Sequence, residues 1–349
     1  MLTFVRRLCL FVFGFAWCSM SFAEEAAPTG DPSILPTGAK LERLWNEGEF
    51  TEGVAVSKEG LVYFSDIAIE AKNPGRIMKF DPASGKMTVH VADSGQSNGL
   101  FFDSKGRLLA VCGANIGLRA LCEVTADNKM KVIADKFDGK KFSSPNDLVV
   151  HPRGWVYFSD PRYVGKEPLE LDHMSVYRVD PDGKVHRATT DIQKPNGVIL
   201  SPDAKTLYVA ETNNGATGLE SAGTKTPQGR MTLNAFPIKD DGSLGPKRVL
   251  VDFGQGTGTD GMTSDTRGRI YCAVRKDERH GIIVFSPEGK ELAYIPTEPL
   301  PTNCTFGKGA DSKTLYITAG QGLYRIKLNA TGYHPEISPL GPGFKLDVF

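Results

Sequence analysis

Six segments of this chain repeat one pattern, in which an oxygen-bearing side chain precedes an apolar run, a polar turn and a second apolar run. The leading residues are Glu52, Asn98, Asn146, Asn196, Asp260 and Asn303. Their separations of 46, 48, 50, 64 and 43 residues are typical of propeller blades. The second runs, such as LVYFSD, WVYFSD and TLYITAG, read as strands buried on both faces. The repeat therefore predicts an all-β fold, a six-bladed β-propeller.

The ends of the repeat array predict how the ring closes. No helical-period segment separates the strands, which argues against a βα array. The last repeat has three obvious strands, whereas residues 40–45, KLERLW, have no partner in their own unit. We expect this N-terminal strand to complete the last blade and remove its exposed edge. Residues 24–38 contain three prolines and are expected to form a flexible leader, with the propeller domain spanning residues 39–349.

The first 23 residues have the pattern of a secretory signal peptide. Arg6 and Arg7 precede a short apolar core, and small residues end at Ala23, where we expect cleavage. A retained membrane anchor is the alternative, but the apolar run is shorter than the roughly 20 residues of a spanning helix. The mature protein is therefore expected to be exported, periplasmic or secreted, without a membrane contact.

Charge and cysteine content limit the partners and the covalent chemistry. Lys plus Arg and Asp plus Glu both number 41, and no basic stripe is visible, which argues against a nucleic-acid partner. Four cysteines follow the signal peptide. A disulfide between Cys112 and Cys122 across a hairpin is compatible with export, and so are buried free thiols.

The six leading residues are candidates for a shared metal site. Each stands just before the first strand of its unit, and in a propeller that strand lines the central channel. Glu52 and Asp260 supply two negative charges, and the four asparagines add neutral oxygens. Calcium prefers six to eight such oxygen ligands, whereas zinc or copper would favour His or Cys. We therefore expect Ca²⁺, or another divalent cation, on the axis. These residue types also begin tight turns, a role compatible with metal binding.

Two short motifs suggest other enzymes but lack the required context. Residues 95–99 match the G-x-S-x-G pattern of serine hydrolases, yet a strand follows where that motif needs a helix. Residues 256–261 match G-x-G-x-x-G by letters, but no helix is expected after them. Neither motif predicts the function.

Several segments together resemble one known family, the SMP-30/gluconolactonase/LRE-like six-bladed propellers. The similar segments are EGVAV at 52–56, SPNDLVVHPRGWVYFSDPRY at 144–163, KPNGVILSPDAKTLYVAET at 194–212, TDGMTSDTRGRIYCAV at 259–274 and GIIVFSPEGKELAYIPTEPLPTNCTFG at 281–307. The resemblance spans nearly the whole mature length. It implies a calcium-dependent lactone hydrolase.

The resemblance also implies roles for individual residues. It assigns the catalytic calcium to Glu52, Asn146, Asn196 and Asp260. It assigns the substrate pocket to Asn98 and Asn303, together with Arg162 and Tyr163. Asp260 is the candidate general base for water attack on the lactone carbonyl, although metal coordination would lower its basicity. An unbound carboxylate acting as base, or direct attack by Asp260, remains open.

The expected activity is hydrolysis of a small-molecule sugar lactone or similar ester. A phosphotriesterase of the same fold is an alternative, because the same metal would polarise a phosphoryl oxygen. A non-catalytic ligand-binding propeller with a structural calcium is a third. The two inward carboxylates favour an enzyme.

Overall fold

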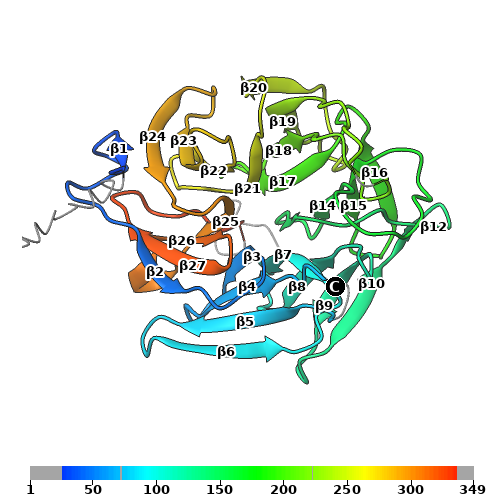
Figure 1. Cartoon of the computed structure of the whole chain (residues 1–349), viewed down its shortest axis with the longest axis horizontal. Helices are drawn as coiled ribbons and strands as arrows, with labels where there is room; N and C mark the ends of the chain where they lie inside the picture. Colours follow the sequence, from blue (N-terminus) through cyan, green and yellow to red (C-terminus); the bar gives the residue numbers. More distant parts are fainter. Residues whose placement is uncertain (1–25, 71–72, 222, 336–349) are drawn as a thin grey trace, which may run out of the picture.

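Among the strands that the structure describes, six antiparallel sheets are arranged around a central axis, as Figure 1 shows. This computed structural model describes residues 26–70, 73–221 and 223–335. Over those ranges the helical structure is one short 3₁₀ turn, η1 (Gly309–Asp311). The predicted all-β, six-bladed propeller is confirmed. The predicted signal peptide over residues 1–23 and the end of the predicted propeller domain, residues 336–349, lie outside the described residues.

Each of the six blades is a meander that runs from the axis outward. Blade 1 contains β3 (Thr51–Val56), β4 (Val62–Asp66), β5 (Arg76–Asp81) and β6 (Lys86–Val91). Blade 2 contains β7 (Ser97–Phe102), β8 (Leu108–Cys112), β9 (Ala120–Val124) and β10 (Met130–Ala134). Blade 3 contains β13 (Leu148–Val150), β14 (Val156–Asp160), β15 (Ser175–Val179) and β16 (Val185–Thr189).

The second half of the ring repeats this order. Blade 4 contains β17 (Pro195–Leu200), β18 (Thr206–Thr212), β19 (Met231–Pro237) and β20 (Arg248–Asp252). Blade 5 contains β21 (Thr259–Ser264), β22 (Ile270–Val274), β23 (Gly281–Phe285) and β24 (Glu291–Pro296). Blade 6 contains β25 (Pro301–Phe306), β26 (Thr314–Ala319), β27 (Gly322–Lys327) and, at its outer edge, β2 (Glu42–Trp45).

The ring closes through a strand from the N-terminal side of the chain. β2 pairs antiparallel with β27, with Glu42 opposite Arg325 and Trp45 opposite Leu323. The predicted closure by the N-terminal strand is therefore confirmed. Because β2 occupies the outer edge of the last blade, the first and last blades are held together by main-chain hydrogen bonds.

The expectation of a flexible leader over residues 24–38 is wrong for its described part, residues 26–38. β1 (Thr29–Gly30) adds to the edge of β24, and Gly30 lies so close to Ala293 that a Cβ there would stand 2.4 Å from the Ala293 Cα. Ile34 is fully buried in the apolar layer between blades 5 and 6. A two-residue strand and one buried isoleucine are too short to produce a periodic pattern of apolar residues. The expectation of flexibility was therefore based on the prolines.

Replacing Ile34 by alanine should destabilise the protein although the residue lies outside the repeats. Removing a fully buried isoleucine side chain typically costs about 2–5 kcal/mol. Chemical denaturation would measure the loss. The matched control is Ile69→Ala, because Ile69 is 65% exposed and should change stability little. Equal, small effects of the two substitutions would contradict the observed packing of the leader.

Apolar side chains fill the space between each pair of neighbouring blades. Tyr63 of blade 1 shares a cluster with Leu100 of blade 2, and Tyr316 of blade 6 shares one with Phe64 of blade 1. The middle strands are buried on both faces, as the sequence of LVYFSD and WVYFSD predicted. The outer strands are half exposed, as in β6 and β16. Blade-to-blade packing therefore makes the ring rigid around its axis.

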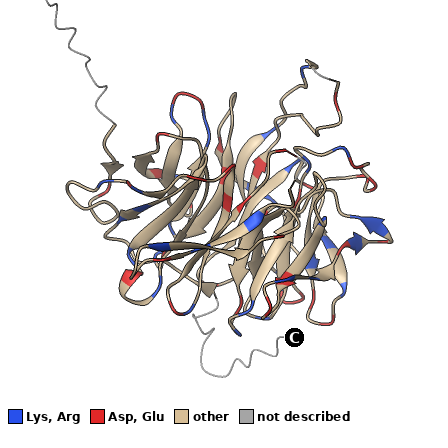
Figure 2. Cartoon of the chain, turned by 60° about the horizontal axis from the view of Figure 1, so that its bottom comes forward, with Lys and Arg blue, Asp and Glu red and all other residues tan. Residues whose placement is uncertain are grey.

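A small hairpin extends from the ring between blades 2 and 3. It consists of β11 (Lys136–Phe137) and β12 (Lys140–Lys141), and its lysines contribute to the blue region at the right of Figure 2. Elsewhere in that view acidic and basic residues are interspersed. Within the part of the chain that is described, no helix is long and apolar enough to cross a bilayer.

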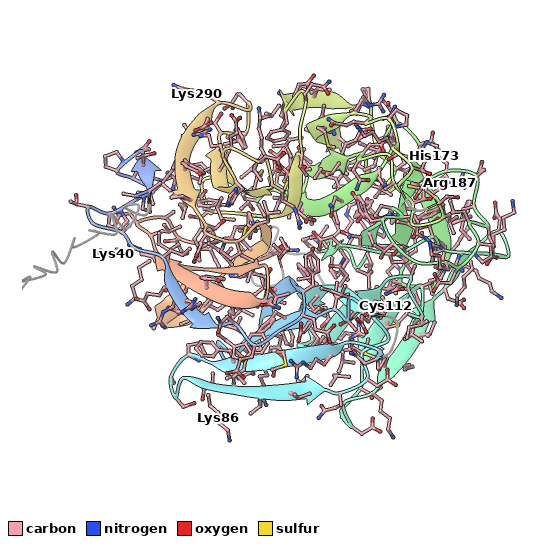
Figure 3. All side chains as sticks on the ribbon, viewed as in Figure 1. Lys40, Lys86, Cys112, His173, Arg187 and Lys290 are labelled. Carbon is pink, nitrogen blue, oxygen red and sulfur yellow. The ribbon has the colours of Figure 1, made fainter. Side chains whose placement is uncertain are left out.

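Cys112 and Cys122, which the sequence left open as a disulfide, face each other on β8 and β9. Both are buried free thiols with their sulfur atoms 3.8 Å apart. Cys112 lies within the ring of blades, whereas Lys86 and Lys290 lie at its outer rim (Figure 3). The pair is thus part of the interior packing of blade 2.

Candidate functional site

The six leading residues predicted as oxygen donors to a metal, called donor positions below, lie around the axis. Five of them are on inner strands, and Asn146 stands two residues before β13. The amide of Gly99 donates to the carbonyl of Asn146 at 2.7 Å, and the Thr302 hydroxyl donates to the carbonyl of Thr51 at 2.7 Å. A Cβ on Gly53 would stand 1.8 Å from the Asn98 carbonyl oxygen. Glycine after a donor therefore permits close approach of adjacent inner strands, and this contact brings the donor positions to one end of the channel.

The same positions coincide with irregularities in the inner strands. Pairing shifts register between Glu52 and Ala55, between Pro195 and Val198, and between Thr259 and Met262. Such bulges interrupt the ladder and redirect side chains. The shift recurs beside Glu52, Asn196 and Asp260, so these three residues depart from regular pairing at equivalent positions of their blades.

Two carboxylates, Glu52 and Asp260, form the electrostatic centre of this arrangement. They are only 4% and 6% exposed. Burial raises the pKa of Glu52 well above its usual range, and the negative charge of Asp260 raises it further. Burial also raises the pKa of Asp260, while hydrogen bonds from Arg275 and Asn196 oppose that rise. Two buried carboxylates that repel each other form an unfavourable pair unless a cation neutralises them.

Asn196 connects the carboxylates to the rim of the channel. Its Nδ2 donates to the Tyr163 hydroxyl at 3.3 Å, and its side chain also hydrogen-bonds Asp260. Its Oδ1 is buried and has no hydrogen-bond partner. A buried carbonyl oxygen without a donor is costly, and it is a suitable ligand for a hard cation.

The donor set fits a hard divalent cation. The described residues contain no group of three or more His, Cys, Asp and Glu side chains that could hold a metal. A cation at this end of the channel would therefore depend on two carboxylates, Glu52 and Asp260, with amide oxygens such as Asn196 Oδ1. This mixed oxygen set is of the kind that calcium accepts and unlike the His and Cys sites of zinc.

The remaining asparagines occupy the expected ring positions with different environments. Asn98 and Asn146 are half-buried. The main-chain carbonyl of Asn98 accepts a hydrogen bond from the Ser65 hydroxyl, and the main-chain carbonyl of Asn146 accepts one from the Gly99 amide. Asn303 is buried, and its Oδ1 accepts from the amide of Cys304 at 2.8 Å. The structure brings all three to the ring. The metal role predicted for Asn146 and the pocket roles of Asn98 and Asn303 stay predictions.

Tyr163 and Arg162, both predicted to face the pocket, have different surroundings. Tyr163 donates to the Thr212 carbonyl at 2.9 Å, and burial together with the charge of Asp260 raises its pKa well above the usual range. Arg162 is instead fully buried and pairs with Glu167 at 3.2 Å. Its Nε and Nη2 are buried and have no hydrogen-bond partner. The pocket role predicted for Arg162 stays a prediction.

A long segment between β18 and β19 is fastened beside Tyr163 by a buried lysine. Lys194 Nζ donates to Asn214 Oδ1 at 2.8 Å and to the carbonyl of Ala216, and it lies 4.3 Å from the centre of the Tyr163 ring. Burial lowers the pKa of Lys194 to about 8. This segment is thus anchored beside the same tyrosine that touches Asn196.

Two functional candidates, Arg275 and Asp147, were not predicted. Arg275 Nη1 lies 2.9 Å from Asp260 Oδ2, but the repeat gives no signal for a residue at the end of a second strand. Asp147 is buried, and burial raises its pKa to about 7, while the amides of Leu148 and Val198 donate to its carboxylate. In four of the six repeats a glycine directly follows the leading residue, whereas Asp147 follows Asn146. This departure from the repeat could have identified Asp147 from the sequence.

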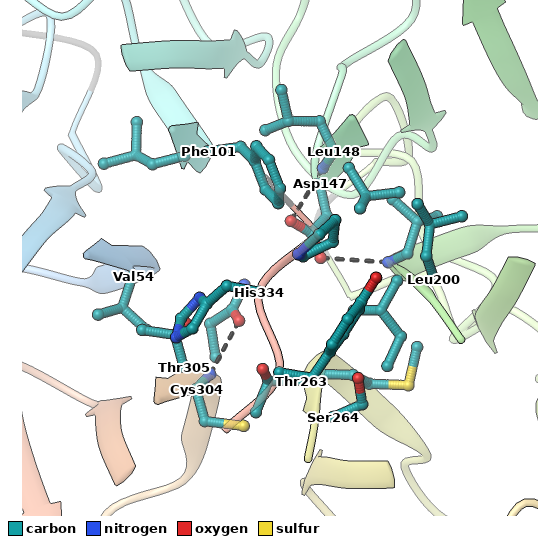
Figure 4. A pocket seen from close by; sticks show the side chains of 18 residues that line it. Val54, Phe101, Asp147, Leu148, Leu200, Thr263, Ser264, Cys304, Thr305 and His334 are labelled. Carbon is teal, nitrogen blue, oxygen red and sulfur yellow. Dashed lines mark hydrogen bonds between the residues drawn. The ribbon is translucent and has the colours of Figure 1, made fainter. Parts of the chain in front are cut away.

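A small cavity of about 70 Å³ lies further along the channel (Figure 4). Side chains of the inner strands line it, including Asp147, Asn303 and Cys304, and the segment around His334 also borders it. Ligand pockets usually measure about 300–1,000 Å³. The cavity is therefore too small for a sugar lactone.

Comparison with known proteins agrees with this architecture. A gluconolactonase of Zymomonas mobilis is 29% identical over 330 residues, which cover 86% of this chain and 84% of the relative. A 6-deoxy-6-sulfogluconolactonase of Pseudomonas putida is 26% identical, over 76% of this chain and 80% of that protein. Among solved structures, a gluconolactonase of Xanthomonas campestris superimposes with a TM-score of 0.72 at 28% identity, covering 87% of this chain and 95% of that one.

The family assignment rests on a match over most of the chain. Residues 50–321, from the first inner strand to the last blade, match the family described as the SMP-30/gluconolactonase/LRE-like region. This range contains all six donor positions, Tyr163 and Arg275. The resemblance inferred from the repeated segments is confirmed. The chain belongs to the SMP-30/gluconolactonase/LRE-like family.

Proposed function

We propose that this protein is a lactonase that opens sugar lactones and depends on a divalent cation, with calcium the expected ion. The observation that carries the proposal is the buried pair Glu52 and Asp260 beside the unpartnered Oδ1 of Asn196. The relatives named gluconolactonase and lactonase support a lactone-hydrolysing enzyme. A small-molecule lactone is therefore the proposed substrate.

Glu52, Asn196 and Asp260 would hold the cation, and Asn146 would add a further amide oxygen. When bound, a divalent cation supplies Lewis-acid polarisation of the carbonyl oxygen, on which negative charge grows during hydrolysis. The two carboxylates match the charge of the ion, and the neutral amides add ligands without adding charge. The proposed division of roles thus follows from charge and donor type.

Asp260 is proposed to accept the proton of the attacking water at a carboxylate oxygen. Burial raises the pKa of Asp260, a bound cation would lower it, and the proposed base role therefore depends on the position of the carboxylate. Arg275 and Asn196 hold it in place through hydrogen bonds, so its orientation is fixed before substrate arrives. Tyr163, half-buried between Lys194 and Asn196, contributes a wall that limits access of water.

Metal removal tests the proposal. We expect the purified protein to hydrolyse glucono-1,5-lactone, to lose nearly all turnover after treatment with a chelator, and to regain it with Ca²⁺. A pH-stat assay measures the acid released, and a panel of aromatic lactones, homoserine lactones and a phosphotriester defines the range. Turnover that survives complete chelation would contradict the metal role. Exclusive turnover of the phosphotriester would contradict the lactonase assignment.

A further inference from the structure

Arg275 is fixed at the donor end of the channel by three contacts. Its amide donates to the carbonyl of Gly258 at 3.0 Å. Its Nη1 donates to Asp260 Oδ2 at 2.9 Å, and the guanidinium lies 5.7 Å from the centre of the Phe50 ring. A main-chain bond, an ion pair and an aromatic face therefore hold this cation next to the carboxylate on which the proposed chemistry depends.

The guanidinium still has donors available for a ligand. Arginine carries five N–H donors, and the bond to Asp260 uses one of them. The side chain of Arg275 is 21% exposed, so part of the fork reaches solvent. Lys194 differs, since it is 1% exposed and its ammonium group is engaged by Asn214 and Ala216. Arg162 is fully buried. Of these three cations near the site, Arg275 is the one whose side chain reaches solvent.

A positive charge at this position has an electrostatic cost for the proposed enzyme. Arg275 Nη1 lies 2.9 Å from a carboxylate that would also bind a divalent cation, so the two positive charges would share one carboxylate and repel each other. A neutral donor would hold Asp260 without that repulsion. An arginine is useful here if it also recognises a negative charge on the substrate, for which its planar fork suits carboxylate and phosphate groups.

We propose that Arg275 recognises an acidic group on the lactone, so that the preferred substrates are sugar lactones with a second, negatively charged substituent. This inference rests on the proposed lactonase function and specifies its substrate class. One edge of the guanidinium stays on Asp260, and the other edge binds the acidic group. The arginine would then align the substrate with the carboxylate that accepts the proton.

The test compares specificity ratios in the full-length, calcium-loaded protein. kcat/KM is measured for neutral glucono-1,5-lactone, for glucaro-1,4-lactone with a carboxylate, and for 6-phosphoglucono-1,5-lactone with a phosphate. We expect wild type to favour at least one acidic lactone over the neutral one. Arg275→Gln should lower the acidic-to-neutral ratio by about 10- to 100-fold, mainly through KM, as expected for loss of a charge-assisted contact. Arg275→Lys should retain part of the ratio.

Controls separate recognition from a counter-ion role. Arg279→Gln is the matched control, because Arg279 is an exposed arginine of the same blade paired with Glu291, and its loss should leave the ratio unchanged. Thermal unfolding and calcium titration check that Arg275→Gln is folded and loaded. Equal losses on acidic and neutral lactones, or a wild-type preference for the neutral lactone, would overturn the proposal.

Failure of the lactonase function would be recognised separately, as absence of turnover on every lactone. Calorimetry of glucarate and gluconate binding would then still test Arg275, because the two ions differ by one carboxylate. Tighter binding of glucarate that Arg275→Gln abolishes would support recognition of the second acid. Equal affinities would overturn it.

Discussion

Asp260→Asn is expected to reduce kcat by about 10²- to 10⁴-fold, the usual contribution of a positioned general base. The amide has nearly the same shape as the carboxylate but cannot accept the proton of the attacking water. The fold should survive, because the substitution removes the repulsion between two buried carboxylates, Asp260 and Glu52. The measurement is kcat by pH-stat at saturating calcium, together with a thermal unfolding scan.

Asp147→Asn is the matched comparison for this experiment. Asp147 is also a buried carboxylate, and its pKa of about 7 suits a base, but two main-chain amides occupy its oxygens and it lines the small channel cavity. We expect Asp147→Asn to retain most of kcat. If that variant is inactive while metal-loaded Asp260→Asn turns over lactone at the wild-type rate, Asp147 rather than Asp260 is the base.

Glu52→Gln is expected to weaken calcium binding by about 100-fold or more, since even the loss of an outer partner of a metal ligand costs about 10- to 100-fold. The substitution removes one of the two negative charges that face the proposed ion. It should also stabilise the metal-free protein, because the Glu52 carboxylate is buried against Asp260 and its pKa is raised by both effects. Titration calorimetry measures the affinity, and unfolding scans with and without calcium measure the stability.

The two readouts for Glu52→Gln should move in opposite directions. The midpoint of unfolding without metal should rise, and the increase on adding calcium should shrink or vanish. Glu47→Gln serves as the matched control, because Glu47 is exposed and lies outside the donor ring. Unchanged calcium affinity in Glu52→Gln would remove Glu52 from the proposed ligand set.

Repetition explains why so much of the architecture was predictable from sequence. One strand–turn–strand pattern occurs six times, so a weak signal at any single segment is reinforced at the other five. The fold requires equivalent residues to occupy equivalent heights around the axis. Glu52, Asn196 and Asp260, separated by more than 200 residues at the extremes, could therefore be placed together before any coordinates were available.

Residues outside the repeated register could not be located in the same way. Arg275 follows the end of β22 and reaches Asp260 through the direction of one long side chain, which the repeat does not encode. The resemblance implied a pocket role for Arg162 together with Tyr163, but the ion pair that Arg162 forms with Glu167 is a loop contact that the repeat does not encode. Ile34 lies in a segment without periodicity, and its burial depends on contacts with two distant blades.

The most direct test of the central claim is a crystal structure of the protein grown with Ca²⁺, with the ion checked by replacement with Mn²⁺ and anomalous scattering. The account predicts one ion at the donor end of the channel, within about 2.3–2.6 Å of carboxylate oxygens from Glu52 and Asp260 and of Asn196 Oδ1. An ion bound elsewhere, with Glu52 and Asp260 contributing no ligand at saturating calcium, would contradict it.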